Sequence, residues 1–254
     1  MRLFQGKKEA EKILSDLKKK IKKAKLKPGL AVILVDGDRA SRLYVELKKG
    51  VAKRVGIRFI LRRFSPGAGQ ERIIKEIKNL NRDKKIHGIL VQLPLPRGYC
   101  TSKIIGAVDP KKDVDRGVLA SVIYFALKKG IRETKQKEIV AVVNSHFFGK
   151  ALEKFFLQKG IRINYLLRKD FSPRRIKSAD AIITICGCPR LIKGDMIKDG
   201  AVLIDAGIPA DVDRESVEKK AAFLTPVPGG LGPLTVALLL KKVYQKAYGS
   251  CQNH

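Results

Sequence analysis

A tyrosine and a lysine four residues apart could support proton-transfer chemistry. Tyr44 and Lys48, with Ser41 one turn earlier, share one face of an expected helix that follows an apolar strand. A lysine that is partly removed from water holds its proton less tightly and serves as a base. The alternative is a surface lysine whose aliphatic stem packs on the tyrosine ring. The abundance of lysine in this chain favours that alternative for the pair taken alone.

A glutamine ends the apolar strand expected over residues 88–93. Pro94 and Pro96 follow directly, and proline cannot continue the hydrogen-bond ladder, so Gln92 lies near the carboxyl end of the strand. A buried amide needs hydrogen-bond partners. Parallel α/β folds bind their ligands at the carboxyl ends of strands. On local grounds Gln92 is a stronger functional candidate than Lys48.

Two carboxylates, Asp113 and Asp115, lie two residues apart where we expect one domain to end. In extended backbone such residues point to the same side. They could bind a ligand together, or they could form a turn or helix cap, and the sequence leaves both open.

A second candidate site follows the apolar strand expected over 139–143. Asn144 and Ser145 open a helix there, where backbone N–H groups and a hydroxyl could bind the phosphates of a dinucleotide. Only one glycine, Gly149, is present, so this is a weak fingerprint. Arg168 follows the next strand, where a basic side chain could bind a 2′-phosphate.

The segment from Thr225 to Thr235 contains three prolines and three glycines and precedes an apolar helix. Proline fixes φ, while glycine permits positive φ and close backbone approach. The segment is either a rigid backbone cradle for a flat or anionic ligand or a proline-rich turn.

Strand and helix patterns alternate along the whole chain, which predicts a parallel α/β fold. The alternation restarts after Asp115, which predicts a second, dinucleotide-binding domain. We expect a catalytic domain over 1–115 plus 235–250 and a Rossmann-like domain over 116–234. Strands are expected at 30–35, 57–64, 88–93, 139–143, 161–166, 181–185 and 201–205, and helices at 8–25, 41–55, 71–81, 118–128, 149–159, 173–177 and 235–248.

Composition restricts the class of protein. The 254 residues include 54 Lys+Arg against 24 Asp+Glu, a net charge of +30. The basic residues are spread along the chain without nucleic-acid-binding motifs, so we expect no dedicated nucleic-acid partner. The N-terminus lacks the apolar core of a signal peptide, no apolar run reaches the length of a membrane span, and the cysteines form no disulfide or zinc pattern. We expect a cytoplasmic protein that binds no metal ion and does not associate with a membrane.

Several segments together resemble the bifunctional methylenetetrahydrofolate dehydrogenase/cyclohydrolase (FolD) family. They occur in the family's order and cover most of the chain: Ala40–Lys48, Gly88–Pro96, Pro110–Asp115, Ala179–Pro189, Gly194–Ile208 and Thr225–Thr235.

The resemblance implies oxidation of 5,10-methylenetetrahydrofolate to the methenyl form with NADP, NAD being the other possible cofactor, and hydrolysis to 10-formyltetrahydrofolate. Lys48 would be the central catalytic residue, Gln92 would tune its protonation, Tyr44 would stack on the folate and Asp115 would bind the pterin. The family also implies a homodimer that acts in one-carbon metabolism. The remaining implied site residues are Leu93, Pro228, Gly229 and Gly230 for the substrate, and Asn144, Ser145, Gly149, Arg168, Ile208 and Thr235 for the cofactor.

The chain departs from the family pattern around the cofactor. A Pro-Cys-Thr-Pro element that usually follows the first domain is missing after Asp115, and Asn144-Ser145 replaces the usual Gly-Arg-Ser. Two alternatives to the bifunctional enzyme therefore stay open at this point. One is a cyclohydrolase with a degenerate nucleotide site, and the other is a basic polyanion-binding protein on the same fold.

Overall fold

The computed structural model describes residues 1–131 and 137–252, and these form two compact units. One unit comprises residues 10–116 and 236–254, and the other comprises residues 1–9 and 117–235. We call them the lysine unit and the nucleotide unit. Helices α1 (Gly6–Lys23) and α8 (Leu231–Gln252) each run from the nucleotide unit into the lysine unit. The C-terminal helix therefore returns to the first half of the chain, as predicted.

The lysine unit is built on a three-stranded parallel sheet in the order β3-β2-β4. Its strands are β2 (Gly29–Val35), β3 (Arg58–Phe64) and β4 (Gly88–Val91). Its other helices are α2 (Arg39–Val55), α3 (Gln70–Arg82) and α4 (Thr101–Gly106).

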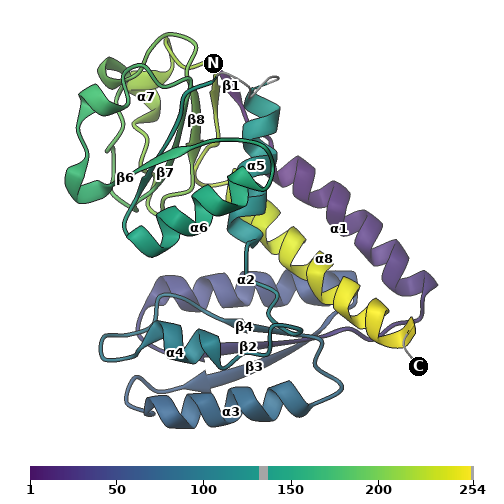
Figure 1. Ribbon diagram of the computed structural model, residues 1–254. Coiled ribbons are helices and arrows are strands. Elements are labelled where there is room, and N and C mark those ends of the chain that lie inside the picture. The colour runs from purple at the N-terminus through teal and green to yellow at the C-terminus, as the bar shows by residue number, and fades with distance from the viewer. Residues whose placement is uncertain (132–136, 253–254) are drawn as a thin grey trace. The chain divides into compact units, whose positions relative to one another are not determined.

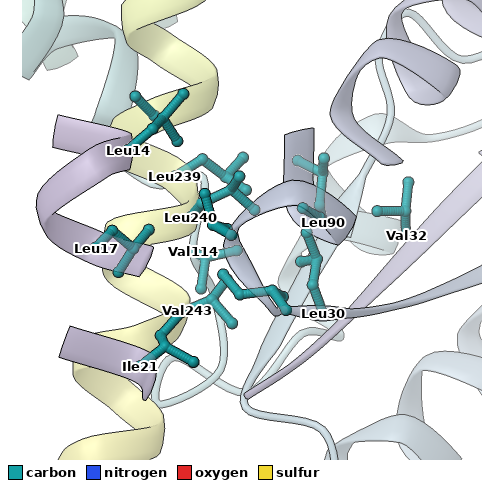
Figure 2. Packing of buried hydrophobic residues seen from close by; sticks show 14 of the residues in the cluster. Leu14, Leu17, Ile21, Leu30, Val32, Leu90, Val114, Leu239, Leu240 and Val243 are labelled. Carbon is teal, nitrogen blue, oxygen red and sulfur yellow. The ribbon is translucent and has the colours of Figure 1, made fainter. Parts of the chain in front are cut away.

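Strand β2 is apolar throughout because both faces of the sheet are covered. Leu30, Val32 and Leu34 pack in one cluster with side chains of α1, α2 and α8, part of which Figure 2 shows. Ala31 and Ile33 pack in a second cluster with side chains of α3 and α4. Figure 1 shows α2 and α3 on opposite sides of this sheet. The alternation follows from the two-residue period of a strand.

The nucleotide unit contains a six-stranded parallel sheet in the order β1-β9-β8-β7-β5-β6. The chain passes from β5 outward to β6 and then crosses back to β7, so the direction of winding reverses between β5 and β7. Open α/β sheets bind ligands at such a reversal. The elements are β1 (Arg2–Leu3), α5 (Val118–Gly130), β5 (Ile139–Val143), α6 (His146–Leu157), β6 (Asn164–Leu167), β7 (Ala181–Ile185), β8 (Val202–Asp205), α7 (Arg214–Val217) and β9 (Phe223–Leu224).

The predicted parallel α/β fold with a Rossmann-like second part is confirmed, with local corrections. Helix α2 begins at Arg39 and not at residue 41 as predicted, because it is capped by Asp38, whose carboxylate accepts the N–H of Ser41 at 2.9 Å. A carboxylate is favoured at a helix N-terminus over a neutral hydroxyl by the helix dipole. The helix predicted over 173–177 is a single 3-10 turn, Pro173–Arg175. Strands β1 and β9 and helices α4 and α7 were not predicted.

Across residues 1–131 and 137–252, no helix is both long and apolar enough to span a membrane. Nor do those residues contain a group of three or more His, Cys, Asp or Glu side chains arranged to hold a metal ion.

Candidate functional site

Lys48 and Gln92 are joined by a short hydrogen bond. The Lys48 Nζ donates to Gln92 Oε1 at 2.6 Å, and Gln92 Nε2 donates to the carbonyl of Leu93 at 2.6 Å. The backbone N–H of Gln92 extends the sheet by donating to Ile33 O at 2.9 Å. Gln92 is 9 % exposed, so its amide has little access to water and is satisfied by these two partners. Strand β4 therefore fixes the group that faces the lysine.

Lys48 is half-buried on α2, one turn after the half-buried Tyr44. Burial lowers the pKa of the Lys48 ammonium, and the nearby Asp115 carboxylate partly restores it. A lysine with a lowered pKa gives up its proton more readily at neutral pH than a surface lysine does. The bond to Gln92 and the lowered pKa favour the hypothesis that Lys48 transfers protons over the alternative that it is a surface lysine packed on Tyr44.

Asp113 and Asp115 have different surroundings. Asp113 is 9 % exposed, and its Oδ1 accepts the backbone N–H groups of Asp115 at 3.1 Å and Arg116 at 3.0 Å. Its Oδ2 lies 3.3 Å from Arg116 Nε. These contacts make Asp113 a turn-forming residue. Within the part of the chain that the structure describes, no hydrogen bond engages the Asp115 carboxylate, which leaves it available to a ligand.

The pKa of the Asp115 carboxyl is raised, whereas that of Lys48 is lowered. Removal from water raises its pKa, while the positive charge of Lys48 opposes the rise. The positive charges of Lys48 and Lys242 favour the ionised form of this carboxyl. The lysine unit thus brings together an amine whose pKa is lowered, an amide hydrogen-bonded to that amine and a carboxylate that no described residue hydrogen-bonds.

In the nucleotide unit, the loops after β5 and β7 are tied together at the reversal of winding. Asn144 Nδ2 donates to Cys186 O at 2.9 Å. Ser145 caps α6, because its Oγ accepts the N–H of Phe148 at 3.3 Å. Asn144 therefore holds the two loops together, and Ser145 lies at a helix N-terminus where a phosphate is favoured.

Gly149 has a packing role on α6. A Cβ at this position would lie 2.4 Å from the ring of Tyr165 on β6, so only glycine allows this helix to approach the strand. The predicted contact of Gly149 with a cofactor stays a prediction.

Asp211 organises the loop after β7, and sequence reasoning missed it. Its Oδ2 accepts the Thr184 hydroxyl and the Cys186 N–H, each at 2.7 Å, and its Oδ1 accepts the Cys188 N–H at 2.6 Å. Asp211 is 0 % exposed. No spacing in the sequence distinguishes this aspartate from other loop aspartates.

Burial raises the pKa values of two ionisable groups that interact with Asp211. Burial raises the pKa of the Asp205 carboxyl to about 6, and the Asp211 charge adds to the rise. Burial and Asp211 also raise the pKa of the Cys186 thiol to about 11. Cys186 is therefore a neutral thiol at physiological pH and is unsuited to act as a nucleophile.

The remaining predicted site residues lie in different places. Arg168 is exposed in the 3-10 turn directly after β6, and Ile208 is 57 % exposed in the loop after β8. The Thr235 hydroxyl donates to Leu231 O at 3.0 Å inside α8. Leu93, after β4, is 39 % exposed in the lysine unit.

The predicted cradle from Thr225 to Thr235 forms a tight turn that leads into α8. The N–H of Gly230 donates to Pro226 O at 2.7 Å, and Gly229 has a φ of 100°. Pro228, Gly229 and Gly230 belong to the nucleotide unit, and their part in substrate binding stays a prediction.

Comparison with known proteins matches both parts of the chain to one family. Residues 4–115 match the tetrahydrofolate dehydrogenase/cyclohydrolase catalytic domain, and residues 119–251 match the NAD(P)-binding domain of the same family. The bifunctional protein FolD of Nautilia profundicola is 38% identical, with 97% of each chain covered. That of Moorella thermoacetica is 37% identical, over 96% of this chain and 98% of the relative.

Solved structures agree with these matches. The bifunctional FolD enzyme of Campylobacter jejuni superposes with a TM-score of 0.88 at 32% identity, covering 98% of this chain and 99% of that one. The Trypanosoma brucei enzyme, solved with NADP and an inhibitor, gives a TM-score of 0.91 at 25% identity and covers 98% of each chain. The chain thus belongs to the tetrahydrofolate dehydrogenase/cyclohydrolase family.

Proposed function

We propose that this protein oxidises 5,10-methylenetetrahydrofolate to the methenyl compound with NADP and hydrolyses that compound to 10-formyltetrahydrofolate, with Lys48, Gln92 and Asp115 as its folate-site residues. The observation that carries the residue assignment is the 2.6 Å hydrogen bond between Lys48 and Gln92, with Asp115 close enough to influence the lysine. Both units match the family, so the two alternatives, a cyclohydrolase alone and a polyanion-binding protein, gain no support.

Hydrolysis of the methenyl bridge needs a group that takes a proton from water. As water adds to the bridging carbon, neutral Lys48 accepts one of its protons. When the carbon–nitrogen bond breaks, the protonated lysine returns that proton to the ring nitrogen, and the remaining hydroxyl proton leaves to solvent as the formyl C=O forms. Gln92 accepts an N–H of Lys48 and so fixes the direction of its lone pair. Asp115, an acceptor-only carboxylate, would bind the N–H donors of the pterin. Tyr44 would stack on the folate ring system, and Leu93 would contribute apolar contact.

Replacing Gln92 with glutamate tests the tuning of Lys48. A carboxylate in place of the amide that now lies 2.6 Å from Nζ would stabilise the ammonium and raise the pKa of Lys48. Lysine is a base only when neutral, so activity should rise with pH through this pKa, and the rise should move to higher pH in Gln92→Glu. The measurement is the pH profile of methenyltetrahydrofolate hydrolysis. An unchanged profile would contradict the assigned role of Gln92, and Gln245→Glu, at an exposed position of α8, is the matched control.

The residues of the nucleotide unit fit a nicotinamide dinucleotide. Asn144 and Ser145 follow β5 at the reversal of winding, and Ser145 lies at the N-terminus of a twelve-residue helix, where phosphate is favoured. Arg168 and Lys169, both exposed, follow β6, where an acidic residue would favour NAD and a basic one NADP. When bound, NADP supplies the acceptor for a hydride. Ile208, Gly149 and Thr235 remain proposed cofactor contacts.

Arg168 is expected to select NADP over NAD. Arg168→Gln removes a charge-assisted hydrogen bond to the 2′-phosphate, which corresponds to an affinity loss of about 10- to 100-fold for NADPH. NADH has no 2′-phosphate, so its affinity should stay unchanged. Titration of the reduced nucleotide's fluorescence gives both affinities without turnover. Equal effects on NADPH and NADH would remove Arg168 from this role, and Arg174→Gln, at an exposed position of the 3-10 turn Pro173–Arg175, is the control for charge alone.

We also propose, from the family resemblance, that the protein is a cytoplasmic homodimer and that it supplies one-carbon units for purine biosynthesis. Sedimentation at micromolar concentration tests the oligomeric state.

A further inference from the structure

Two lysines of α8 donate hydrogen bonds to the backbone of residues 111–116, the segment that carries Asp115. Lys242 Nζ donates to Arg116 O at 2.6 Å, and Lys246 Nζ donates to Lys111 O at 2.6 Å. Lys242 and Lys246 are one helical turn apart, so they contact the two ends of this segment from the same face of α8. All these residues belong to the lysine unit.

Strand β4 holds the same segment from another side. The Ile89 N–H donates to Lys112 O at 2.8 Å, and Ile89 forms a parallel bridge with Asp113. Val114 is 0 % exposed and packs in the same cluster as Val243 of α8, as Figure 2 shows. The segment is therefore fixed by β4, by apolar packing and by lysine ammonium groups, and Asp115 projects from a backbone with little freedom.

Lys242 also acts on the charge of this segment. Its half-buried ammonium interacts favourably with the carboxylates of both Asp113 and Asp115, while Lys246 and Arg116 oppose its positive charge. Asp115 is thus influenced by two lysines, Lys48 from α2 and Lys242 from α8. Lys48 is assigned to the chemistry, whereas Lys242 bonds a backbone carbonyl next to the carboxylate.

We propose that Lys242 is a positioning residue that fixes the direction of the Asp115 carboxylate through its bond to the Arg116 carbonyl. The inference rests on the proposed function, because the role of Asp115 is to bind the pterin. It gives the return of the C-terminal helix a role in substrate binding in addition to its packing.

Lys242→Met tests the proposal, because methionine keeps an apolar stem and removes the ammonium. We expect the KM for 5,10-methylenetetrahydrofolate to rise about tenfold, the size of one lost charge-assisted hydrogen bond, with kcat changed less than about twofold. Lys241→Met, at an exposed position beside it, removes the same charge and should leave KM within about twofold. Lys242→Arg should restore part of the affinity.

Combining Lys242→Met with Asp115→Ala shows whether Lys242 acts by positioning the Asp115 carboxylate or through a general effect on the structure. If Lys242 acts through Asp115, adding Lys242→Met to Asp115→Ala should raise KM no further. Additive effects, or an unchanged KM in Lys242→Met alone, would overturn the proposal while leaving the proposed function intact. If Asp115→Ala itself leaves KM unchanged, the assignment of Asp115 to the folate fails first. Lys242→Gln, which keeps a donor of shorter reach, provides a second variant if the methionine variant folds poorly.

Discussion

Replacing Lys48 with methionine is expected to lower the rate of methenyltetrahydrofolate hydrolysis by about 10²- to 10⁴-fold, the usual contribution of a positioned general base. Lys48 is the group in the lysine unit whose pKa is lowered by burial and whose Nζ is directed by Gln92. Methionine keeps the length and apolar character of the side chain but cannot accept a proton. The measurement is the decay of the absorbance of the methenyl compound.

The same substitution has two opposing effects on the stability of the protein. The folded-state pKa of Lys48 lies below that of the unfolded chain, so its ammonium lowers stability at neutral pH, and this penalty fades as the pH rises toward the unfolded value. Removing the ammonium relieves this penalty but leaves Gln92 Oε1 without its donor, so Lys48→Met should unfold at a temperature close to that of the unaltered protein at pH 7. Lys49→Met, on the exposed side of α2, is the matched control and should hydrolyse at the original rate. Wild-type hydrolysis by Lys48→Met would refute the assignment.

Asp211→Asn is expected to destabilise the nucleotide unit by about 1–3 kcal/mol, the cost of a buried donor left without an acceptor. The carboxylate uses both oxygens to accept three hydrogen bonds, from Thr184, Cys186 and Cys188. An amide offers one oxygen, and its NH₂ group would face an N–H or O–H donor. The loop over residues 186–188 follows β7 at the reversal of winding, so NADPH affinity should fall as well.

Denaturant unfolding and NADPH fluorescence titration measure the two effects of Asp211→Asn. Asp199→Asn, at an exposed loop position, removes the same charge and should change neither. Unfolding and NADPH affinity like those of the unaltered protein would show that the buried network does not support the cofactor loops.

The sequence predicted much of the fold because its signals were local. Strand β2 is an uninterrupted apolar run, which parallel strands buried on both faces require. Gln92 was found because an amide in an apolar strand next to prolines must have a partner. Strand β1 could not be predicted, because two residues carry no periodicity and its pairing with β9 joins distant parts of the chain.

The parts of the site that sequence reasoning missed depend on long-range contacts. Lys242 is one of 54 basic residues, and only the packing of α8 brings it to the Arg116 carbonyl. Asp113 and Asp115 are both aspartates with similar neighbours in sequence. Only the Asp113 carboxylate accepts the backbone N–H groups of the turn. Such distinctions arise from tertiary structure and not from composition or spacing.

Incubation of the protein with 5,10-methylenetetrahydrofolate and either NADP or NAD, with the reduced nicotinamide recorded over time, tests the central claim most directly. We predict formation of NADPH, little formation of NADH, and conversion of the methenyl product to 10-formyltetrahydrofolate that slows by about 10²- to 10⁴-fold in Lys48→Met. No reduction of either nucleotide by the folded protein would contradict the assignment as a dehydrogenase.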